Sequence, residues 1–491
     1  MQFERWTSVK NQQLWIRHPV FKLVVVSTII LFLCSSLRHL LFQSTAFELG
    51  IYDQVAYLIS IDQPPISSFL GIHHLGNHAA LIMYPVALFY KIYPSVYWLF
   101  LIQSISLSLG AWPTWSLARQ AGLSSKIAGA IALAYLLYPV IFNVNLFDFH
   151  PEVIALPAIL GAILAARMNK IFWFCLAIVW ILSCKDALAL TVAAMGIWLY
   201  FFEKKRTCGL IAMLVGMTWF VIAVQGIIPY FKSGQGPGGT GRYPEFGDSV
   251  FEILTNIFLR PRLAFSKVFS LESLEYLVLL FSPVALWLSP YCLSPLVAAL
   301  PVITKNLLSN VTAQRDLIHQ YSVPVIPFLI TIMIASIASN HQFYLGKYLH
   351  LHLQKVECHL SETLHRFIII SSIVGFVCLA KFGYFWSIYL EQIDTWSACR
   401  AAISLVTTQD GLLTTSNLAS HLSQRQLIRF TNIDDPPQDL SRFKYVLLNI
   451  RHPGWKSTSK FSKNLVTQLE QSPNFHLTYQ QDDVYLFTQK P

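Results

Sequence analysis

Charged residues are scarce in this sequence. Asp, Glu, Lys and Arg together make up 12% of the 491 residues, about half the fraction that is typical of soluble domains. Hydrophobic residues account for 54%, and the mean hydropathy is +0.51. A chain this apolar cannot cover its own surface in water. The composition therefore excludes a wholly soluble protein and requires lipid as the solvent for much of the chain.

The cysteines do not form the pattern of a disulfide framework. The chain has eight, and a cysteine in an apolar run acts as a small hydrophobic residue. Most of them lie in such runs: Cys34, Cys175, Cys184, Cys292 and Cys378. Cys399 is the one that falls in the segment we place outside the membrane, and it has no partner there. The sequence does not predict a disulfide-stabilised scaffold.

The formal net charge of +10 does not indicate a nucleic-acid-binding protein. The basic residues lie in short clusters between apolar runs, and this is how membrane topology is encoded. The sequence therefore predicts the lipid bilayer as a partner and no nucleic acid.

Eleven apolar runs predict transmembrane segments, although several lie near the lower length limit for crossing a bilayer. They must be helices, because lipid offers no partner for free backbone amides and the runs lack the alternation of transmembrane strands. The predicted spans are 20–42, 95–118, 126–146, 153–168, 170–184, 186–202, 207–231, 274–288, 290–304, 320–338 and 367–389.

A further apolar segment, 79–93, decides the topology. It is short and contains Pro85 and Lys91, so we interpret it as an interfacial or re-entrant helix rather than a span. With eleven spans, the basic residues fall on one side, as the positive-inside rule requires. They are Lys10, Arg17 and Lys22, Arg119 and Lys126, Arg167 and Lys170, the 203–206 cluster, and Lys347, Lys355 and Arg366 in the 339–366 loop.

This topology predicts a multi-pass protein of the cell membrane in three parts. Residues 1–19 are a cytoplasmic tail, 20–389 a transmembrane domain, and 390–491 an extracytoplasmic domain. The acidic and histidine-rich loops also fall outside, namely 43–78, 147–152, 184–186, 232–272 and 305–320.

The segment 390–491 changes character. It is polar, and short β-rich runs alternate with helix-like stretches at 396–408 and 460–471. Such alternation predicts a small α/β domain. The expected strands are Leu412–Thr415, Leu427–Phe430, Tyr445–Ile450, Phe475–Gln480 and Val484–Thr488.

Two carboxylates, Glu48 and Asp53, follow the first predicted span in a mainly apolar setting. Such an acid can have its pKa raised and serve as a general base, and acids at membrane depth are costly unless they are used. A spacing of five places them on different faces of a continuous helix. Either Gly50 breaks the helix or only one acid faces a site. The alternative is an interfacial helix with solvated acids.

His74 and His78 are four residues apart, a spacing that metal ligands use on a helix. With the nearby acids they are a candidate site for a divalent metal ion, the one cofactor that the sequence suggests. However, Gly76 weakens the helix, and zinc sites need a fuller ligand set. An interfacial role is the stronger interpretation.

Asp148, His150 and Glu152 lie within five residues at the exit of a predicted span. Pro151 suits the first turn of the next helix. This group is the strongest local signal in the sequence and predicts a catalytic role for Asp148, with His150 and Glu152 contacting substrate. A capped, solvated loop is the alternative.

Single basic groups occur on the same predicted side. Lys185 and Asp186 separate two apolar runs, where they either neutralise each other or hold a phosphate through the lysine. The glycine-rich stretch 234–244 lacks the ending of a phosphate-binding P-loop and predicts a mobile loop, in which Arg242, beside Tyr243, is suited to clamp a phosphate.

His319, Gln320 and Tyr321 precede a predicted span that carries Pro324 and Pro327. Because the prolines loosen the helix start, these polar groups are candidates for substrate contact. An ordinary interfacial cap with a tyrosine anchor is the alternative.

These motifs together resemble a known family. Their order is Phe47 to Gln54, His74 with His78, Phe147 to Glu152, Arg242-Tyr243 with Gly247, His319 to Tyr321, and Ser420 to Arg425. From about residue 43 to its end, the chain resembles the bacterial membrane proteins grouped as domain-of-unknown-function family 2079 (DUF2079). The order and the membrane side of the motifs carry the resemblance.

That family in turn looks like the GT-C superfamily of membrane glycosyltransferases, which includes protein mannosyltransferases and aminoarabinose transferases. The resemblance implies a sugar donor linked to polyprenyl phosphate, chemistry on the outer face, and an essential acid in the first outer loop. It implies that Asp53 or Glu48 is the base or metal-linked acid. Because the family usually has Asp where this chain has Glu48, the greater weight falls on Asp53.

The resemblance also implies that Asp148, His150 and Glu152 line the same cavity and that Arg242 or Lys185 holds the carrier phosphate. The leading hypothesis is an inverting glycosyltransferase. A transporter or flippase is the rival, although the sequence shows no internal repeat of the kind that transporters usually have. A non-catalytic assembly protein that binds partners through its outer domain is a third alternative.

Overall fold

The computed structural model describes residues 18–339 and 360–490. Nearly all of the predicted cytoplasmic tail 1–19 and most of the basic 339–366 loop lie outside these residues.

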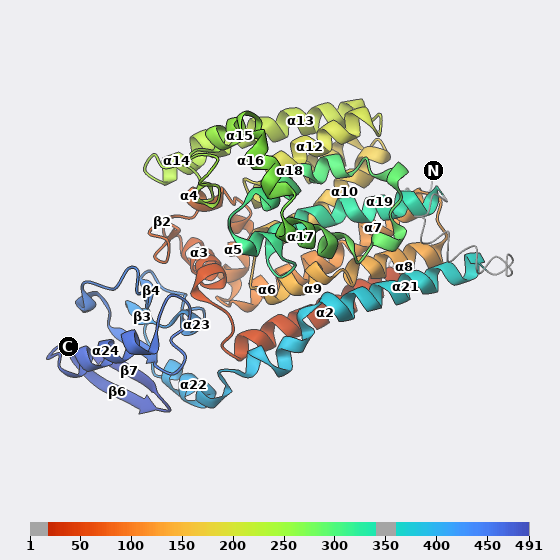
Figure 1. The fold of residues 1–491 in the computed structure, drawn as a ribbon. Coiled ribbons are helices and arrows are strands. Elements are labelled where there is room, and N and C mark those ends of the chain that lie inside the picture. The colour runs from red at the N-terminus through yellow and green to blue at the C-terminus, as the bar shows by residue number, and fades with distance from the viewer. Residues whose placement is uncertain (1–17, 340–359, 491) are drawn as a thin grey trace.

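Two bodies make up the described chain, a large helical bundle and a small tail domain at one end of it (Figure 1). The helices of the bundle are α2 Pro19–Leu40, α3 Ile51–Ser60, α4 Leu75–His78, α5 Met83–Ile92, α6 Tyr97–Leu109, α7 Ala111–Gln120, α8 Ser125–Leu136, α9 Pro139–Leu146, α10 Leu156–Arg167, α11 Ile171–Cys184, α12 Leu188–Phe201, α13 Arg206–Val221, α14 Ile228–Phe231, α15 Val250–Leu259, α16 Pro261–Val268, α17 Leu271–Phe281, α18 Leu296–Leu308, α19 Ile326–Ala338 and α21 Leu360–Leu379. A two-residue hairpin, β1 Ile66–Ser67 and β2 Ile72–His73, lies between α3 and α4.

Within the described residues, four helical segments are long and apolar enough to cross a membrane: Pro19–Leu40, Ser125–Leu146, Arg206–Phe231 and Thr312–Ala338. A fifth is added if Thr363–Leu379 and Lys381–Leu390, which meet at a bend of 43°, form one span. All five coincide with predicted spans. The other six predicted spans contain shorter helices, so the total of eleven stays a prediction.

In two segments the helix is too short to cross a bilayer, and the structure shows where it ends. The helix expected in 274–288 is α17, which ends at Phe281, two residues before Pro283. The segment 79–93 forms the ten-residue helix α5, about 15 Å long at 1.5 Å per residue. This is half the thickness of a bilayer core, in keeping with the decision not to count it as a span.

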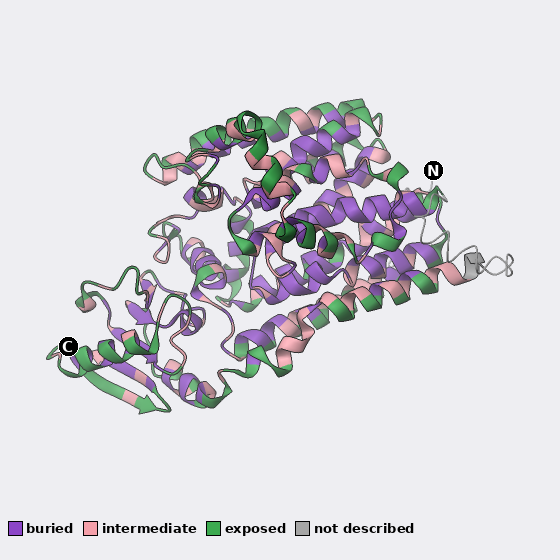
Figure 2. Ribbon diagram, viewed as in Figure 1, coloured by how far each residue is buried: buried purple, intermediate pink, exposed green. Residues whose placement is uncertain are grey.

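The bundle exposes apolar side chains where a lipid-facing surface is expected. On α2, Val26, Ile29 and Leu33 are exposed, as are Ile370 and Val374 on α21. In Figure 2 exposed and half-buried residues run along both helices, while the inner helices of the bundle are mostly buried. Exposed apolar surface of this extent is stable in lipid and not in water.

Close helix contacts in the bundle depend on glycine. A Cβ added to Gly196 of α12 would lie 2.6 Å from the carbonyl oxygen of Gly209 in α13, and one added to Gly216 would lie 2.7 Å from the backbone nitrogen of Ala193. Small residues at such crossings let helix backbones touch, which is how helices gain packing energy in a membrane.

The tail domain is a five-stranded sheet with helices on both faces, which confirms the predicted α/β domain. Its elements are α22 Trp396–Ser404, β3 Leu412–Thr414, α23 Ser416–Ala419, β4 Ile428–Phe430, β5 Tyr445–Asn449, α24 Ser459–Glu470, β6 Phe475–Gln481 and β7 Val484–Gln489. The strand order is β4-β3-β5-β7-β6, with β3 parallel to both of its neighbours and the remaining pairs antiparallel.

Alternation along the strands gives the sheet two apolar faces. Leu412 and Leu447 pack with α22, whereas Leu413 and Val446 pack with α24. The central strands β3 and β5 are buried along their whole length because both faces are covered, whereas the edge strand β6 is mostly exposed.

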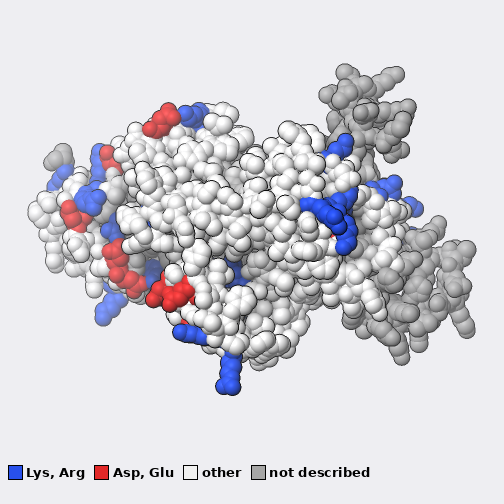
Figure 3. All heavy atoms as spheres, turned by 90° about the horizontal axis from the view of Figure 1, so that it is seen from above, with Lys and Arg blue, Asp and Glu red and all other residues white. Residues whose placement is uncertain are grey.

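Charge is distributed unevenly along the bundle. On the face shown in Figure 3, acidic and basic side chains lie together toward the end that carries the tail domain, while the described residues of the opposite end present basic side chains alone. This polarity agrees with the positive-inside pattern, although it does not by itself assign the two sides of the membrane.

Candidate active site

The loop between α2 and α3, residues 41–50, has an unusual backbone at Glu48. The φ and ψ angles of this residue are 112° and −84°, a region that a residue with a side chain rarely adopts. The loop therefore does not continue α2 into α3 as one helix. Such a conformation persists only where surrounding contacts hold it, and strained residues cluster at functional sites.

Glu48 forms an ion pair with His150. The carboxylate Oε2 lies 3.2 Å from the imidazole Nε2, and the His150 side chain is fully buried while that of Glu48 is 28% exposed. Burial opposes ionisation of Glu48, but His150 outweighs it and lowers the pKa of the carboxyl. In turn, Glu48 outweighs burial at His150 and raises the pKa of the imidazole. Each partner therefore favours the charged form of the other.

A second buried ion pair lies next to the first. The Lys185 Nζ atom is 2.6 Å from Oε1 of Glu152. Glu152 lies in the 3₁₀ turn Pro151–Ala155, and Lys185 lies in the extended break between α11 and α12. Burial opposes ionisation of Glu152, yet Lys185 and His150 lower its pKa to about 2. The other oxygen of Glu152 is buried without a hydrogen-bond partner, so an acceptor remains free there.

Two more cations approach this group around Tyr321. The Arg242 guanidinium lies 5.1 Å and the Lys305 Nζ atom 5.9 Å from the centre of the Tyr321 ring. Arg242 is held by the 3₁₀ turn Thr240–Arg242, whose last carbonyl accepts a hydrogen bond from the Asn310 backbone. We did not predict Lys305 from the sequence, although a lone lysine in the apolar helix α18 is a recognisable signal. Lys185, Lys305 and Arg242 make a basic cluster suited to an anion.

Of the predicted contact residues Tyr243 and Gln320, Tyr243 touches the basic cluster through the backbone of Lys305. The Tyr243 hydroxyl donates to the Lys305 carbonyl at 3.1 Å, which anchors the glycine-rich loop against α18. Gln320 is buried, and its amide oxygen has no hydrogen-bond partner.

Asp148 is held by Arg38 of α2. Its Oδ1 accepts from the Arg38 guanidinium, and its Oδ2 accepts from the Thr45 backbone at 3.1 Å. Arg38 also donates to the Gln43 carbonyl at 2.5 Å. Both oxygens of Asp148 are thus used to fix the 41–50 loop, and a base so occupied is poorly placed to take a proton. This geometry favours a positioning role, and the catalytic role predicted for Asp148 stays a prediction.

Asp53 lies in a separate cluster. It accepts hydrogen bonds from the Tyr90 hydroxyl at 2.7 Å, from the Ser423 hydroxyl at 2.6 Å and from the Gln424 amide at 3.1 Å. Burial raises its pKa, although the three donors act in the opposite direction. The structure does not bring Asp53 together with Glu48 and His150.

His319 borders a cavity beside the ion pairs. Its Nδ1 atom is 2.6 Å from Oδ2 of Asp316, and its ring lies edge-on to Phe147, which stacks on His150. The cavity measures about 460 Å³ and is also lined by Arg315. Phe147 therefore separates this cavity from the Glu48–His150 pair by one ring.

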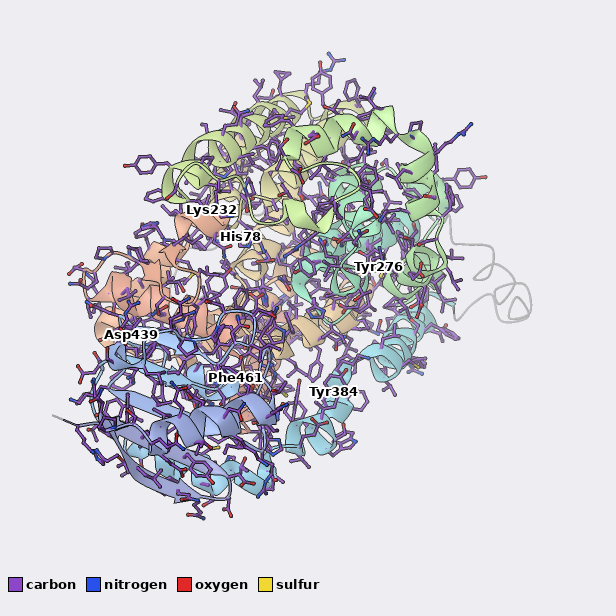
Figure 4. All side chains as sticks on the ribbon, turned by 60° about the vertical axis from the view of Figure 1, so that its left-hand side comes forward. His78, Lys232, Tyr276, Tyr384, Asp439 and Phe461 are labelled. Atoms are coloured by element: carbon purple, nitrogen blue, oxygen red, sulfur yellow. The ribbon has the colours of Figure 1, made fainter. Side chains whose placement is uncertain are left out.

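His74 and His78 point to different partners. His78 lies 3.2 Å from Asp186, and Figure 4 shows it near the loop at Lys232, where α4 meets α14. His74 is buried beside His73 and Tyr84, and burial lowers its pKa to about 3. Among the residues that the structure describes, no group of three His, Cys, Asp or Glu side chains is placed to hold a metal ion. The predicted metal site is therefore not assembled by these residues.

The 41–50 loop is bound by the tail domain as well as by the bundle. Asn417 donates to the Phe42 carbonyl at 2.7 Å, and Ser416 accepts from the Ala46 backbone at 3.4 Å. The side chains of Phe42 and Ala46 belong to the apolar core of the tail domain. Sequence analysis placed the two segments on the same side but did not predict this contact.

Comparison with known proteins agrees with this architecture. A family model described as a predicted membrane protein, DUF2079, matches residues 38–486. A search of curated proteins found no match.

Two solved structures share the fold. ArnT from Cupriavidus metallidurans bound to undecaprenyl phosphate has a TM-score of 0.53 and 12% identity, over 95% of this chain and 97% of ArnT. The apo state of the same protein has a TM-score of 0.55 and 12% identity, over 97% and 98%. At this identity the likeness shows the fold alone, a GT-C-like membrane fold, as predicted.

Proposed function

The chain belongs to the DUF2079 family of predicted membrane proteins, and from this premise we propose that it transfers a sugar from a polyprenyl-phosphate donor to an acceptor hydroxyl. Glu48 is the general base, and Lys185, Lys305 and Arg242 receive the donor phosphate. One observation carries the proposal: the two ion pairs Glu48–His150 and Glu152–Lys185 lie beside the cations Lys305 and Arg242.

Glu48 is suited to accept a proton. It is ionised because His150 lowers its pKa, and part of its side chain is exposed while its partner is not. The strained backbone fixes where the carboxylate points, so little reorganisation is needed when substrate binds. A carboxylate held in this way accelerates proton transfer by about 10² to 10⁴ when it is within hydrogen-bond reach of the reacting hydroxyl.

The reaction proceeds by one displacement. Glu48 takes the proton of the acceptor hydroxyl, the oxygen forms a bond to the anomeric carbon, and the bond from that carbon to the phosphate oxygen breaks with its electron pair on the leaving group. The product is an inverted glycoside and a polyprenyl phosphate that carries one more negative charge. The basic cluster stabilises this developing charge, and Glu48 returns its proton to solvent.

The fold supports the choice of donor. ArnT, which shares the fold over nearly the whole chain, was solved bound to undecaprenyl phosphate. In this chain the basic cluster supplies three cations where a lipid phosphate would need them, and Arg242 can bind phosphate with two parallel hydrogen bonds. Among the residues that the structure describes, Glu152 is the one carboxylate that forms an ion pair with the basic cluster, so positive charge remains for a ligand.

Sugar transfer in proteoliposomes tests the proposal. Purified protein is reconstituted with undecaprenyl phosphate that carries a radiolabelled sugar, together with an envelope extract as the source of acceptor. We expect a labelled product from the wild type and a loss of at least about 100-fold with Glu48→Gln. Glu470→Gln, an exposed acid at the end of α24, is the matched control. Solute uptake without a covalent product would contradict the proposal.

We also propose that the site and the tail domain face the extracytoplasmic side, with the N-terminus in the cytoplasm. The basic end of the bundle supports this orientation (Figure 3). A Lys463→Cys substitution on the exposed side of α24 should react with a membrane-impermeant maleimide in intact cells. Labelling that needs membrane permeabilisation would reverse the orientation.

A further inference from the structure

The parallel part of the tail-domain sheet has an edge at which ligands commonly bind. The chain passes from β3 to β4 on one side and returns to β5 on the other side of β3. In open α/β sheets, ligands bind outside the carboxyl ends of the strands where the order reverses in this way. Here that position lies between the ends of β3 and β5, next to residues 415–417 and 450–457.

Two exposed aromatic rings meet at this edge. Phe47 comes from the 41–50 loop, and Trp455 comes from the loop after β5; their ring centroids are 5.2 Å apart. Phe47 is 36% and Trp455 48% exposed. Beneath them lies Phe430, the last residue of β4, with its ring centroid 5.8 Å from that of Trp455. Both rings thus pack on the tail domain and stay partly exposed, and the Lys456 Nζ atom lies 5.6 Å from the centre of the Trp455 ring.

The backbone holds these rings in place. Gly454 has φ +79°, and an added Cβ would lie 3.0 Å from the Asn417 side-chain oxygen and 3.2 Å from the Ser416 backbone nitrogen. No other residue fits this close approach without strain. The Lys456 carbonyl accepts from the Ile433 backbone at 2.9 Å, which ties the Trp455 loop to the segment after β4.

The strained turn joins this edge to the proposed base. Phe47 reaches Trp455 of the tail domain, and the next residue, Glu48, reaches His150 of the bundle. Consecutive Cα atoms are 3.8 Å apart, so a molecule lying on Phe47 is within a few atoms of the Glu48 backbone.

The charges near the rings favour an uncharged ligand. The charged side chains around this edge form ion pairs with one another, namely Arg429 with Asp435, Lys456 with Asp434, and Arg451 with Asp394. An anionic or cationic ligand would find its countercharge already occupied. An aromatic ring, by contrast, presents a negative face that attracts the C–H groups on the apolar face of a sugar ring.

We propose that Phe47 and Trp455 form the subsite for a neutral saccharide acceptor. The inference rests on the proposed glycosyl transfer and deepens it, because it names the acceptor class and assigns the tail domain a part in binding it. The acceptor sugar stacks on the two rings and presents a hydroxyl toward Glu48.

Binding of the detergent-solubilised full-length protein to a printed array of neutral and phosphorylated oligosaccharides tests this subsite without requiring turnover. We expect the wild type to bind at least one neutral glycan. Trp455→Ala and Phe47→Leu should each weaken that binding about tenfold, equivalent to about 1.4 kcal/mol. Trp455→Phe should restore much of it, because an aromatic face remains.

Two controls separate the possible failures. Trp386→Ala removes another exposed tryptophan, far from this edge in sequence, and should bind as the wild type does. Glu470→Gln, the exposed control of the transfer assay, should also bind as the wild type does. The subsite would be overturned if the wild type bound phosphorylated glycans alone or no glycan at all. It would also be overturned if Trp455→Ala bound neutral glycans as well as the wild type does.

The proposed glycosyl transfer has a separate test: it is wrong if the wild type releases no sugar from the lipid-linked donor. The array result still decides the subsite in that case, since glycan binding does not depend on the donor. Loss of array binding with intact release of sugar to water would show the converse, a functioning donor site without this acceptor subsite.

Discussion

Glu48 and Asp53 are five residues apart and have opposite surroundings. Glu48 is partly exposed and is paired with the cation His150, whereas Asp53 is buried and is held by three neutral donors from α5 and the tail domain. A cation partner lowers the pKa of a carboxyl, and burial raises it. The comparison shows that position in a loop does not identify a base; the partners and the access to solvent do.

The largest difference should appear in transfer rate. Glu48→Gln keeps the shape of the side chain and removes the proton acceptor, so sugar transfer should fall by about 10² to 10⁴. Asp53→Asn should reduce it by less than about tenfold. Initial rates in proteoliposomes at saturating donor measure both. Equal losses would show that the two carboxylates share one role.

Breaking the buried Lys185–Glu152 pair should have the next largest effect. Lys185→Met leaves Glu152 as an uncompensated buried charge, which destabilises a protein by about 3–5 kcal/mol. The double variant Lys185→Met with Glu152→Gln should recover most of that stability but not phosphate binding. Thermal unfolding in detergent, followed with and without undecaprenyl phosphate, distinguishes the two properties. A double variant as unstable as the single one would contradict this.

Removing one hydrogen bond to Asp53 should lower the free energy of unfolding by a smaller amount. Ser423→Ala removes one of three donors to a buried carboxylate, a loss of about 1–3 kcal/mol. Because this bond joins the tail domain to α3, the variant should be cut sooner by protease near the junction. Ser441→Ala, remote from Asp53 in the exposed turn Leu440–Arg442, is the control. Unchanged protease resistance would show that the bond does not hold the two bodies together.

The smallest expected effect is a shift in the pH dependence of the transfer rate. His150 lowers the pKa of Glu48 below its ordinary value of 4.5, so Glu48 stays ionised, and transfer continues, until the pH falls through that lowered value. His150→Gln leaves burial unopposed by the imidazole, so the acid limb of the pH–rate profile should move to higher pH. His476→Gln, at an exposed histidine on β6, should leave the limb in place. A limb unmoved by His150→Gln would mean that Glu48 is not the titrating base.

The same pair has a stability signature with a defined sign. The lowered pKa of Glu48 adds stability above 4.5 that is lost as pH falls through the folded value. The raised pKa of His150 adds stability below 6.5 that is lost as pH rises through its folded value. The ion pair therefore contributes fully between these two ordinary values.

Local patterns predicted the fold better than the site. Apolar runs located the long helices, and short β-rich runs located all five strands of the tail domain, because both signals arise within a few residues. The grouping of His150 and Glu152 was also readable, since they lie on one short turn.

The roles of Asp148 and Asp53 were not readable, because their partners come from far along the chain. Asp148 is paired with Arg38 of the first helix, 110 residues away, and Asp53 with Ser423, 370 residues away. Lys305 was missed for a related reason, since its neighbours at Tyr321 and Arg242 are brought together only by packing. A pairwise contact of this kind leaves no trace in composition or spacing.

The 41–50 loop inserts Phe42 and Ala46 into the core of the tail domain, and this has a consequence for biosynthesis. The segment that receives them is translated almost four hundred residues later, long after the loop has left the ribosome. A nascent chain therefore holds the 41–50 loop by its contacts with the bundle alone until the tail domain has been synthesised. Completion of the 41–50 loop is thus coupled to completion of the polypeptide, and a prematurely terminated chain would lack the apolar core that receives Phe42 and Ala46.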